Sequence, residues 1–260
     1  FLILLTIYRS NRAEWLAKLL AEQLKLEPPS PFEVVDIVVN TWPTSRWLKE
    51  ELAIVNKISA LIRFPFPGSY LKQIVQNILD EKVENDPWDT DQLVWTLLDL
   101  LPEFLSLKEA EPLKNWIYRH NPDLSHLNKE TWRIARCIAD TFDDYALYRP
   151  EYLNHWIESD NQSSIFSPSF PPLMQWQPLL FRELSKRINP KPFCLQVHTA
   201  IERLRKGDKP NEPLPKVLRI FGLSSLAPVQ IELLQAISGL TNVQIFLLTP
   251  CPELWQRCKS

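Results

Sequence analysis

Glycine is scarce in this chain. Its 260 residues include 4 glycines against 23 prolines, whereas average usage is about 7% glycine and about 5% proline. Loops that cradle phosphates need glycine, because the backbone must approach the phosphate closely and adopt positive φ. The four glycines, Gly68, Gly207, Gly222 and Gly239, are too far apart to form a GxxxxGK[ST] or a GxGxxG motif. The sequence therefore excludes a P-loop ATPase site and a Rossmann dinucleotide site in this segment.

Metal-binding and nucleophile patterns are also missing. The 4 cysteines show neither CxxC spacing nor a neighbouring histidine pair, so we expect no zinc site. They are Cys137, Cys194, Cys251 and Cys258. We interpret them as free thiols of a reducing cytosol, which predicts a cytoplasmic protein. No histidine stands at a readable spacing from a serine or cysteine nucleophile, so acyl-transfer chemistry has no support.

Excess charge and long apolar runs are absent too. The formal net charge is -2, from 29 basic and 31 acidic residues, so any contact with nucleic acid must be local. The opening "FLILLTIY" is short and lacks a basic flank and a cleavage site, which predicts a buried first strand and no membrane segment. The chain starts without methionine and stops after a strand-like run, and we therefore expect a piece of a longer protein.

Short apolar runs alternate with amphipathic stretches between Phe1 and about Ile78, which predicts a βαβα order with parallel strands. In "AEWLAKLLAEQL" we expect one face centred on Trp15, Leu19 and Leu20 to cover the sheet, with Leu16 and Leu24 at its edges. The same alternation returns after Pro215 in "KVLRIFGL", "APVQIELLQAI" and "NVQIFLLTP". The sequence therefore predicts an α/β fold with a parallel sheet.

Strand-like runs vanish between Asp86 and about Ile188, where amphipathic helical segments alternate with proline-containing connectors. We predict a split α/β domain, residues 1–85 and 189–260, with an inserted all-helical subdomain, residues 86–188. The stretch "DTDQLVWTLLDLLPEFL" has Asp89 at an N-cap position and Gln92 three residues later, so capping explains these acids better than a metal does. We expect "DNQSSIFSPSFPP", residues 160–172, to be a surface loop.

Three aspartates precede a proline in "IADTFDDYALYRP". A helix over residues 136–148 would place Asp140, Asp143 and Asp144 on one face, at spacings of i, i+3 and i+4. Its apolar face would carry Ile138, Phe142 and Tyr145. Pro150 disfavours helix at Arg149, so we expect the guanidinium to emerge where the helix ends.

This acidic cluster has three interpretations. It can be a solvated acidic face whose negative charge is partly balanced by Arg133 and Arg136. A catalytic metal site would need a convergent carboxylate, histidine or lysine at a nuclease-like spacing, and none is identified. A recognition surface is the third, because carboxylates accept hydrogen bonds from base amino groups and arginine pairs with guanine or stacks on a base. The residues alone leave the first and the third open.

A second candidate is "RFPFPGSYLK", in which two prolines flank Phe66 and Tyr70 and Lys72 follow. Rigid aromatic rings beside a basic group suit stacking on single-stranded bases. A proline-fixed turn from strand to helix with a core aromatic is the alternative. For the 10 tryptophans, packing on apolar helix faces is the default interpretation.

Several ordered motifs carry a resemblance to a known family. They are "IYRSNR", "RFPFPGSY", "DTFDDYALYRPEYLNHW", "QWQPLLFREL", "LRIFGLSSLAPVQIELLQAI" and "LLTPCPELW". In this order they resemble the N-terminal part of the RecC family, the exodeoxyribonuclease V gamma subunits of RecBCD enzymes. The resemblance spans essentially the whole chain, which would be roughly the first quarter of a family member.

The resemblance implies a superfamily 1 helicase-like first domain that has lost its ATP-binding motifs, which fits the missing glycines. It also implies a noncatalytic scaffold between a RecB-like helicase-nuclease and a RecD-like helicase in double-strand break repair. Such a subunit binds DNA ends, guides single strands and scans the 3′ strand for a Chi-like sequence. ATP and Mg²⁺ would then be bound by the partner subunits, with no cofactor, catalytic site or membrane contact in this segment.

Residues of the family's scanning channel fall on specific positions of this chain. The apolar channel residue of the "FPFP" turn falls on Phe66, and the acidic and basic ones on Asp140, Asp143 and Arg149. Lys72 replaces a family aromatic, and Thr141 and Asp144 stand at positions whose residue type differs, so this chain can recognise a different sequence or none. Polar channel positions fall on Asn40, Trp42 and Arg46. The alternatives to this function are an active ATP-dependent helicase or nuclease, and a protein-interaction module without DNA contact.

Overall fold

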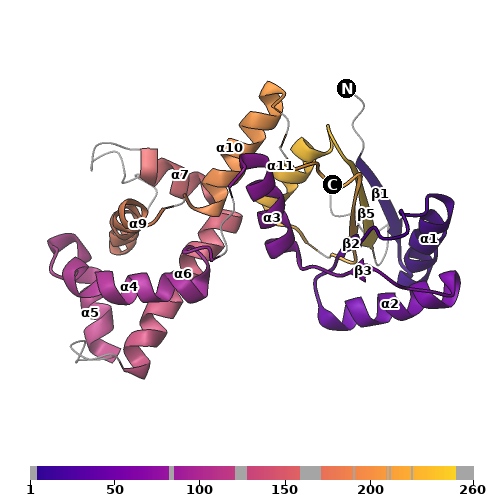
Figure 1. Cartoon of the computed structure of the whole chain (residues 1–260). Coiled ribbons are helices and arrows are strands. Elements are labelled where there is room, and N and C mark those ends of the chain that lie inside the picture. The colour runs from indigo at the N-terminus through magenta and orange to yellow at the C-terminus, as the bar shows by residue number, and fades with distance from the viewer. Residues whose placement is uncertain are drawn as a thin grey trace, which may run out of the picture. The chain divides into compact units, whose positions relative to one another are not determined.

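The computed structural model divides the chain into two compact units (Figure 1). Unit 1 comprises residues 1–81 and 201–260, and unit 2 comprises residues 82–200. The structure describes residues 5–81, 85–120, 128–158, 171–189, 191–208, 210, 212–223 and 225–249. Most of the expected loop over residues 160–172 lies outside these ranges.

A parallel five-stranded sheet forms the centre of unit 1. Its strands are β1 (Leu5–Ser10), β2 (Val35–Val38), β3 (Ile62–Arg63), β4 (Val217–Phe221) and β5 (Asn242–Leu248), in the order β1-β5-β4-β2-β3. The register pairs Leu5 with Val243, Arg219 with Gln244, and Val35 with Ile62. The prediction of an α/β fold with a parallel sheet is confirmed, and strands from both ends of the chain are neighbours in one sheet.

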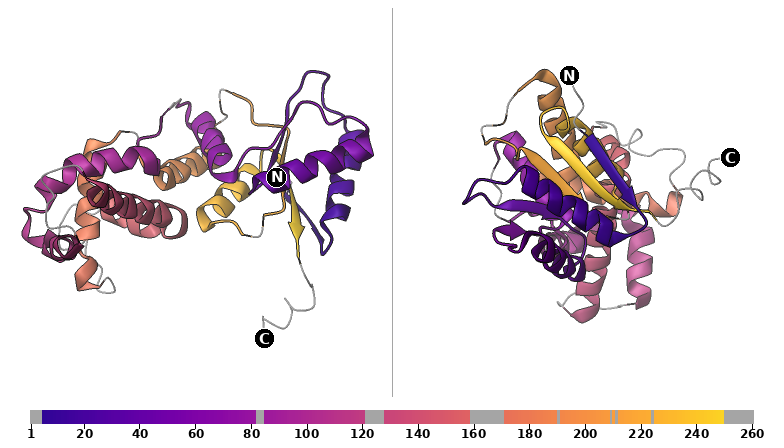
Figure 2. Two further views of the ribbon diagram at one scale, coloured as in Figure 1. Left: turned by 90° about the horizontal axis from the view of Figure 1, so that it is seen from below. Right: turned by 90° about the vertical axis from the view of Figure 1, so that its right-hand side faces the viewer.

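Helices cover both faces of this sheet (Figures 1 and 2). One face carries α1 (Ala13–Leu26) and α2 (Trp42–Asn56), and the other carries α3 (Pro67–Leu79) and α11 (Pro228–Ile237). The core between the sheet and the first pair includes Leu20, Leu48, Phe221 and Phe246. Apolar faces on both sides explain why the strands read as apolar runs rather than strict alternations.

The prediction of a buried first strand is wrong for its described part. Strand β1 lies at an edge of the sheet, where β5 is its hydrogen-bonded neighbour, and Ile7 is exposed. An apolar run indicates a strand, but its burial depends on which strands and helices pack beside it. Residues 1–4 lie outside the described ranges.

The predicted face of α1 is confirmed for Leu16, Leu20 and Leu24 and is wrong for Trp15 and Leu19. Its buried residues are Leu16, Ala17, Leu20, Ala21 and Leu24, whereas Trp15 and Leu19 are exposed. The two alanines allow the helix to approach the sheet closely, and this turns the larger side chains of Trp15 and Leu19 toward solvent. Arg12 lies over the Trp15 ring, with the guanidinium carbon 5.3 Å from the ring centroid.

Unit 2 is helical throughout its described residues. It contains α4 (Thr90–Phe104), the 3₁₀ turn η1 (Lys108–Ala110), α5 (Glu111–His120), α6 (Lys129–Tyr148), α7 (Pro150–Glu158), the 3₁₀ turn η2 (Pro172–Met174), α9 (Trp176–Arg187) and the first part of α10 (Phe193–Lys206). Asp89 is the N-cap residue of α4, as expected, but its side chain makes no capping hydrogen bond. That this unit is an insertion into a helicase-like domain stays a prediction.

Aromatic rings fill the core of unit 2 around Phe181. Its ring centroid lies 5.2 Å from those of Trp88 and Phe142 and 5.9 Å from that of Trp156. Core packing is therefore confirmed for Trp88 and Trp156. It is wrong for five exposed tryptophans, Trp15, Trp42, Trp95, Trp116 and Trp132, which are between 40% and 73% exposed.

Cys137 is exposed and Cys194 is buried, and both are free thiols. Cys251 and Cys258 lie outside the described residues. Within the described ranges, no three His, Cys, Asp or Glu side chains gather where they could hold a metal ion. None of the helices in those ranges combines the length and the apolar character needed to cross a bilayer.

The two described thiols are expected to differ sharply in reactivity. Burial raises the pKa of the Cys194 thiol to about 12, so little of it is the reactive thiolate at neutral pH. We expect iodoacetamide to modify Cys137 in the native protein, and Cys194 after unfolding in guanidinium chloride. Peptide mass mapping measures both. Equal native labelling of the two thiols would contradict the buried position of Cys194.

Candidate nucleic-acid interface

Helix α6 carries the acidic cluster, and local signals fix both of its ends. Asn128 is the N-cap, and its side chain accepts a hydrogen bond from the Thr131 N–H at 2.9 Å. At the other end, Arg149 leaves the helical conformation with φ -139° and ψ 48°, and Pro150 begins α7. The helix predicted over residues 136–148 is confirmed, as is its end at Arg149.

The two faces of α6 lie as the spacing predicts. Ile138 and Phe142 are buried, and Tyr145 is half-buried. The Tyr145 hydroxyl donates a hydrogen bond to Gln177 Oε1 at 2.9 Å, which joins α6 to α9. Asp140, Asp143 and Asp144 are all exposed. Their carboxylates therefore lie on the solvent side of the helix.

Arg136 neutralises part of this acidic face. Its Nε donates to Asp140 Oδ1 at 3.0 Å, and its Nη1 donates to Asp91 on α4. The hydrogen bond to Asp91, supported by Asp140, raises the pKa of the Arg136 guanidinium, although burial acts in the opposite direction. Asp140 is thus held in an ion pair within α6 by an arginine that also bridges to α4, and this leaves it less able to contact a ligand than an unpaired carboxylate.

Arg149 lies at the C-terminal end of α6, and its side chain is exposed. Its N–H donates to the Tyr145 carbonyl at 2.9 Å, which fixes the backbone from which the side chain projects. Within the described part of the chain the guanidinium forms no ion pair. A cation is favourable beside the partial negative charge of a helix C-terminus, and this arginine keeps its donors available for a ligand.

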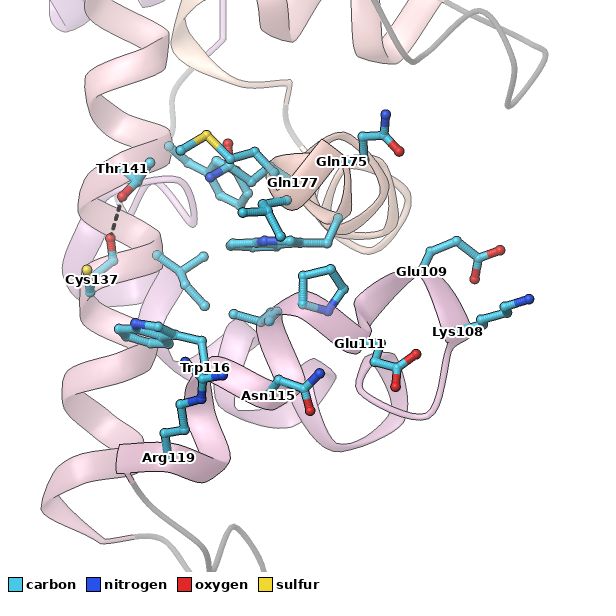
Figure 3. A pocket seen from close by; sticks show the side chains of 17 residues that line it. Lys108, Glu109, Glu111, Asn115, Trp116, Arg119, Cys137, Thr141, Gln175 and Gln177 are labelled. Atoms are coloured by element: carbon cyan, nitrogen blue, oxygen red, sulfur yellow. Dashed lines mark hydrogen bonds between the residues drawn. The ribbon is translucent and has the colours of Figure 1, made fainter. Parts of the chain in front are cut away.

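The Thr141 side chain has different surroundings from those of the aspartates. Its hydroxyl donates to the Cys137 carbonyl of its own helix at 2.8 Å. Both residues line a pocket of about 950 Å³ between α5, α6 and the residues 173–177, in which Trp116 lies at one side (Figure 3). Thr141 therefore belongs to the pocket wall, and the structure does not place it on the acidic face.

In unit 1 the remaining candidates lie at the carboxyl ends of β2 and β3. The Trp42 and Phe66 rings meet edge to face, with centroids 5.5 Å apart and planes at 84°. The Val39 N–H donates to the Pro65 carbonyl at 3.1 Å, which joins the two turns. Trp42 is 73% exposed. The predicted turn from strand to helix at "FPFP" is confirmed, and it places Phe66 against an exposed indole.

Polar candidates surround this aromatic pair unequally. Asn40 is exposed just before α2, and Arg46 on α2 is exposed, with its Nε 3.6 Å from Glu50 Oε1. Lys72 on α3 is half-buried. Tyr70 is buried, and burial raises the pKa of its phenol to about 12. The stacking interpretation is therefore wrong for Tyr70, whose burial fits the alternative of a core aromatic.

Two residues at this edge were not identified from the sequence. Thr41 is the N-cap of α2, and its hydroxyl accepts a hydrogen bond from the Thr44 N–H at 3.2 Å. Gly222 follows β4 with φ 70°, a conformation that favours glycine. A Cβ on Gly222 would lie 3.7 Å from the Thr44 methyl group. The "TWPT" run is a capping signal that could have identified Thr41, whereas Gly222 has no comparable signal.

The candidates thus form two groups, one in each unit. The Trp42–Phe66 pair belongs to unit 1, and the α6 residues from Asp140 to Arg149 belong to unit 2. A family model described as the RecC N-terminal domain matches residues 5–260. The chain belongs to the RecC family. The resemblance predicted from the sequence motifs is confirmed.

Curated RecC proteins match nearly the whole chain. "RecBCD enzyme subunit RecC" of Haemophilus influenzae is 30% identical over 96% of the chain. The proteins of the same name from Escherichia coli and Mycobacterium tuberculosis are 25% and 27% identical over 99% and 97%. The chain spans 24%, 22% and 23% of the length of these three relatives, or about a quarter of a RecC protein.

Proposed function

We propose that this chain is part of a noncatalytic, DNA-binding and scaffolding subunit of a RecBCD-type helicase-nuclease that acts in double-strand break repair. The observation that carries the proposal is the RecC family match over residues 5–260, with relatives that are named as RecBCD enzyme subunits. RecB-like and RecD-like subunits would be its partners in the cytoplasm. They would bind the ATP and Mg²⁺ for which this segment has no glycine-rich loop.

The carboxyl edge of the unit 1 sheet supports a path for single-stranded DNA. Exposed aromatic rings stack on bases of any sequence, and Trp42, held by Phe66, offers such a ring. Helices α2 and α3 both begin at this edge, and the positive ends of their dipoles favour phosphate oxygens. Arg46 and Lys72 lie on these two helices and add positive charge beside the ring.

The end of α6 supports recognition of bases. Asp143, Asp144 and Arg149 are exposed, and together they provide acceptors for base amino groups and donors for guanine. Asp140, held by Arg136, would contribute mainly by positioning the residues that contact bases. We propose that these residues scan the 3′ strand for a Chi-like sequence. Lys72, Thr141 and Asp144 depart from the family pattern, so the recognised sequence would differ from the one that this pattern reads.

The triple variant Asp140→Ala, Asp143→Ala, Arg149→Ala tests this proposal in the assembled full-length complex. We expect one octamer in a library of embedded sequences to attenuate DNA degradation by the wild-type complex, and the triple variant to lose that attenuation. Degradation products are measured by sequencing. General unwinding should persist, because the substitutions lie on an exposed helix face.

A matched control is the triple variant Glu109→Ala, Glu111→Ala, Lys114→Ala, which removes the same charges from exposed positions on η1 and α5. It should keep the sequence-dependent attenuation. If the Asp140, Asp143 and Arg149 variant processes every octamer as the wild type does, the acidic face is a solvated surface and does not recognise DNA sequence.

A further inference from the structure

Six large apolar side chains are exposed around the loops that precede β2 and β3. They are Leu26, Phe32, Val34, Ile54, Ile58 and Leu61, and they are between 42% and 92% exposed. We call this group the amino-edge patch. Exposed apolar side chains that gather in one region of a soluble protein commonly mark an interaction site.

The topology brings these six residues to one edge of the sheet. Leu26 ends α1, and Ile54 lies in the last turn of α2. In a parallel α/β sheet, helices end at the edge where the next strand begins. Val34 and Leu61 immediately precede Val35 and Ile62, which are paired in the register of β2 and β3. This is the opposite edge from the Trp42–Phe66 pair.

The backbone holds part of the patch in an unfavourable conformation. Leu61 has φ 55°, a left-handed conformation that is uncommon for a bulky residue without a side-chain amide or carboxylate. The Leu61 carbonyl accepts a hydrogen bond from the Val35 N–H at 2.9 Å, which fixes this geometry. Strained backbone persists where surrounding structure requires it and clusters at binding positions.

Charges of both signs lie at this edge. The acids of the first loop, Glu27 and Glu33, lie close enough to the buried Arg219 to oppose the lowering of its pKa that burial causes. The Ser30 N–H donates a hydrogen bond to Glu33 at 3.0 Å, and this bond, with the charges of Lys216 and Arg219, lowers the pKa of the Glu33 carboxyl. The exposed apolar side chains, rather than charge of one sign, therefore distinguish this edge.

We propose that the amino-edge patch is covered by an apolar surface of the same polypeptide, contributed by a segment outside residues 1–260. The relatives are about four times as long as the stretch that this chain matches, so most of their residues belong to such segments. Surfaces this apolar are typical of permanent contacts. A segment of the same chain meets the patch at a high effective concentration, which favours it over a separate subunit or a second copy.

Photo-crosslinking of the full-length subunit tests this inference. Phe32 and Ile58 are replaced, one at a time, by benzoylphenylalanine, and the protein is irradiated alone and within the complex. We expect crosslinks to peptides outside residues 1–260 of the same polypeptide in both samples, identified by mass spectrometry. Glu22, exposed on α1, is the control position for chance encounters and should yield few such crosslinks.

Each other outcome overturns the inference. Crosslinks that form only with another subunit, or only with a second copy, assign the patch to those partners. An absence of crosslinks above the Glu22 background shows that the patch is solvated. The result is independent of the proposed DNA contacts, because the Asp140, Asp143 and Arg149 variant should keep the Phe32 and Ile58 crosslinks whether or not DNA recognition fails.

Discussion

The Phe181→Ala substitution is expected to lower the free energy of unfolding of unit 2 by about 3–5 kcal/mol. Phe181 on α9 is 1% exposed and contacts Trp88, Phe142 and Trp156. These partners lie before α4, on α6 and on α7, so one ring joins four parts of the unit. Its removal loses the transfer energy of the ring and leaves a cavity between helices that cannot all move together.

Hydrogen exchange on the full-length protein measures this effect, because it separates unit 2 from the rest of the chain. The amides of α6, α7 and α9 should lose protection in Phe181→Ala, and a denaturant series gives the change in opening free energy. The control Trp95→Ala removes an exposed ring from α4 and should change stability by less than about 0.5 kcal/mol. A loss below about 1 kcal/mol for Phe181→Ala would be incompatible with its central position.

The Trp42→Ala substitution is expected to weaken binding of single-stranded DNA by about 1–3 kcal/mol, which is roughly 5- to 150-fold in affinity. The reason is the loss of a stacking surface at the carboxyl edge of β2. Because Trp42 is largely exposed, the substitution should leave folding intact. Trp42→Phe keeps an aromatic face and should retain most of the affinity.

Fluorescence anisotropy with a labelled oligothymidine measures this affinity in the assembled complex without ATP. Trp95→Ala is the matched control, since it removes an exposed indole from α4 in unit 2. It should leave DNA affinity unchanged. Equal affinity of Trp42→Ala and the wild type would remove unit 1 from the proposed strand path.

Periodicity predicted most elements of the fold. The strands and helices of unit 1 were predictable because short apolar runs alternate with amphipathic stretches. β3 was indicated only by the proline-fixed turn that follows it, since its two residues are too few to show any period. The face of α1 was misjudged because hydrophobicity alone ranks Trp15 above Ala17, whereas close packing on the sheet selects the small residue.

The candidate site was predictable only where it is local. Helical spacing predicted the exposed aspartates of α6, and Pro150 predicted the position of Arg149. The contact of Trp42 with Phe66 depends on the pairing of β2 with β3, which no local pattern reveals. The burial of Tyr70 likewise depends on the sheet that α3 covers. The roles of these residues in DNA binding stay predictions.

The strand order determines when each unit can fold during synthesis. β1 pairs with β5, so after β1 has left the ribosome it waits for this neighbour until residues 242–248 have been made. At about 5–20 residues per second, that delay is on the order of ten seconds or more. Unit 2 is continuous in sequence, and its helices can pack during this interval. Phe221 and Phe246, which belong to the same core as the apolar face of α1, are made only at the end of this interval, so that core stays incomplete until then.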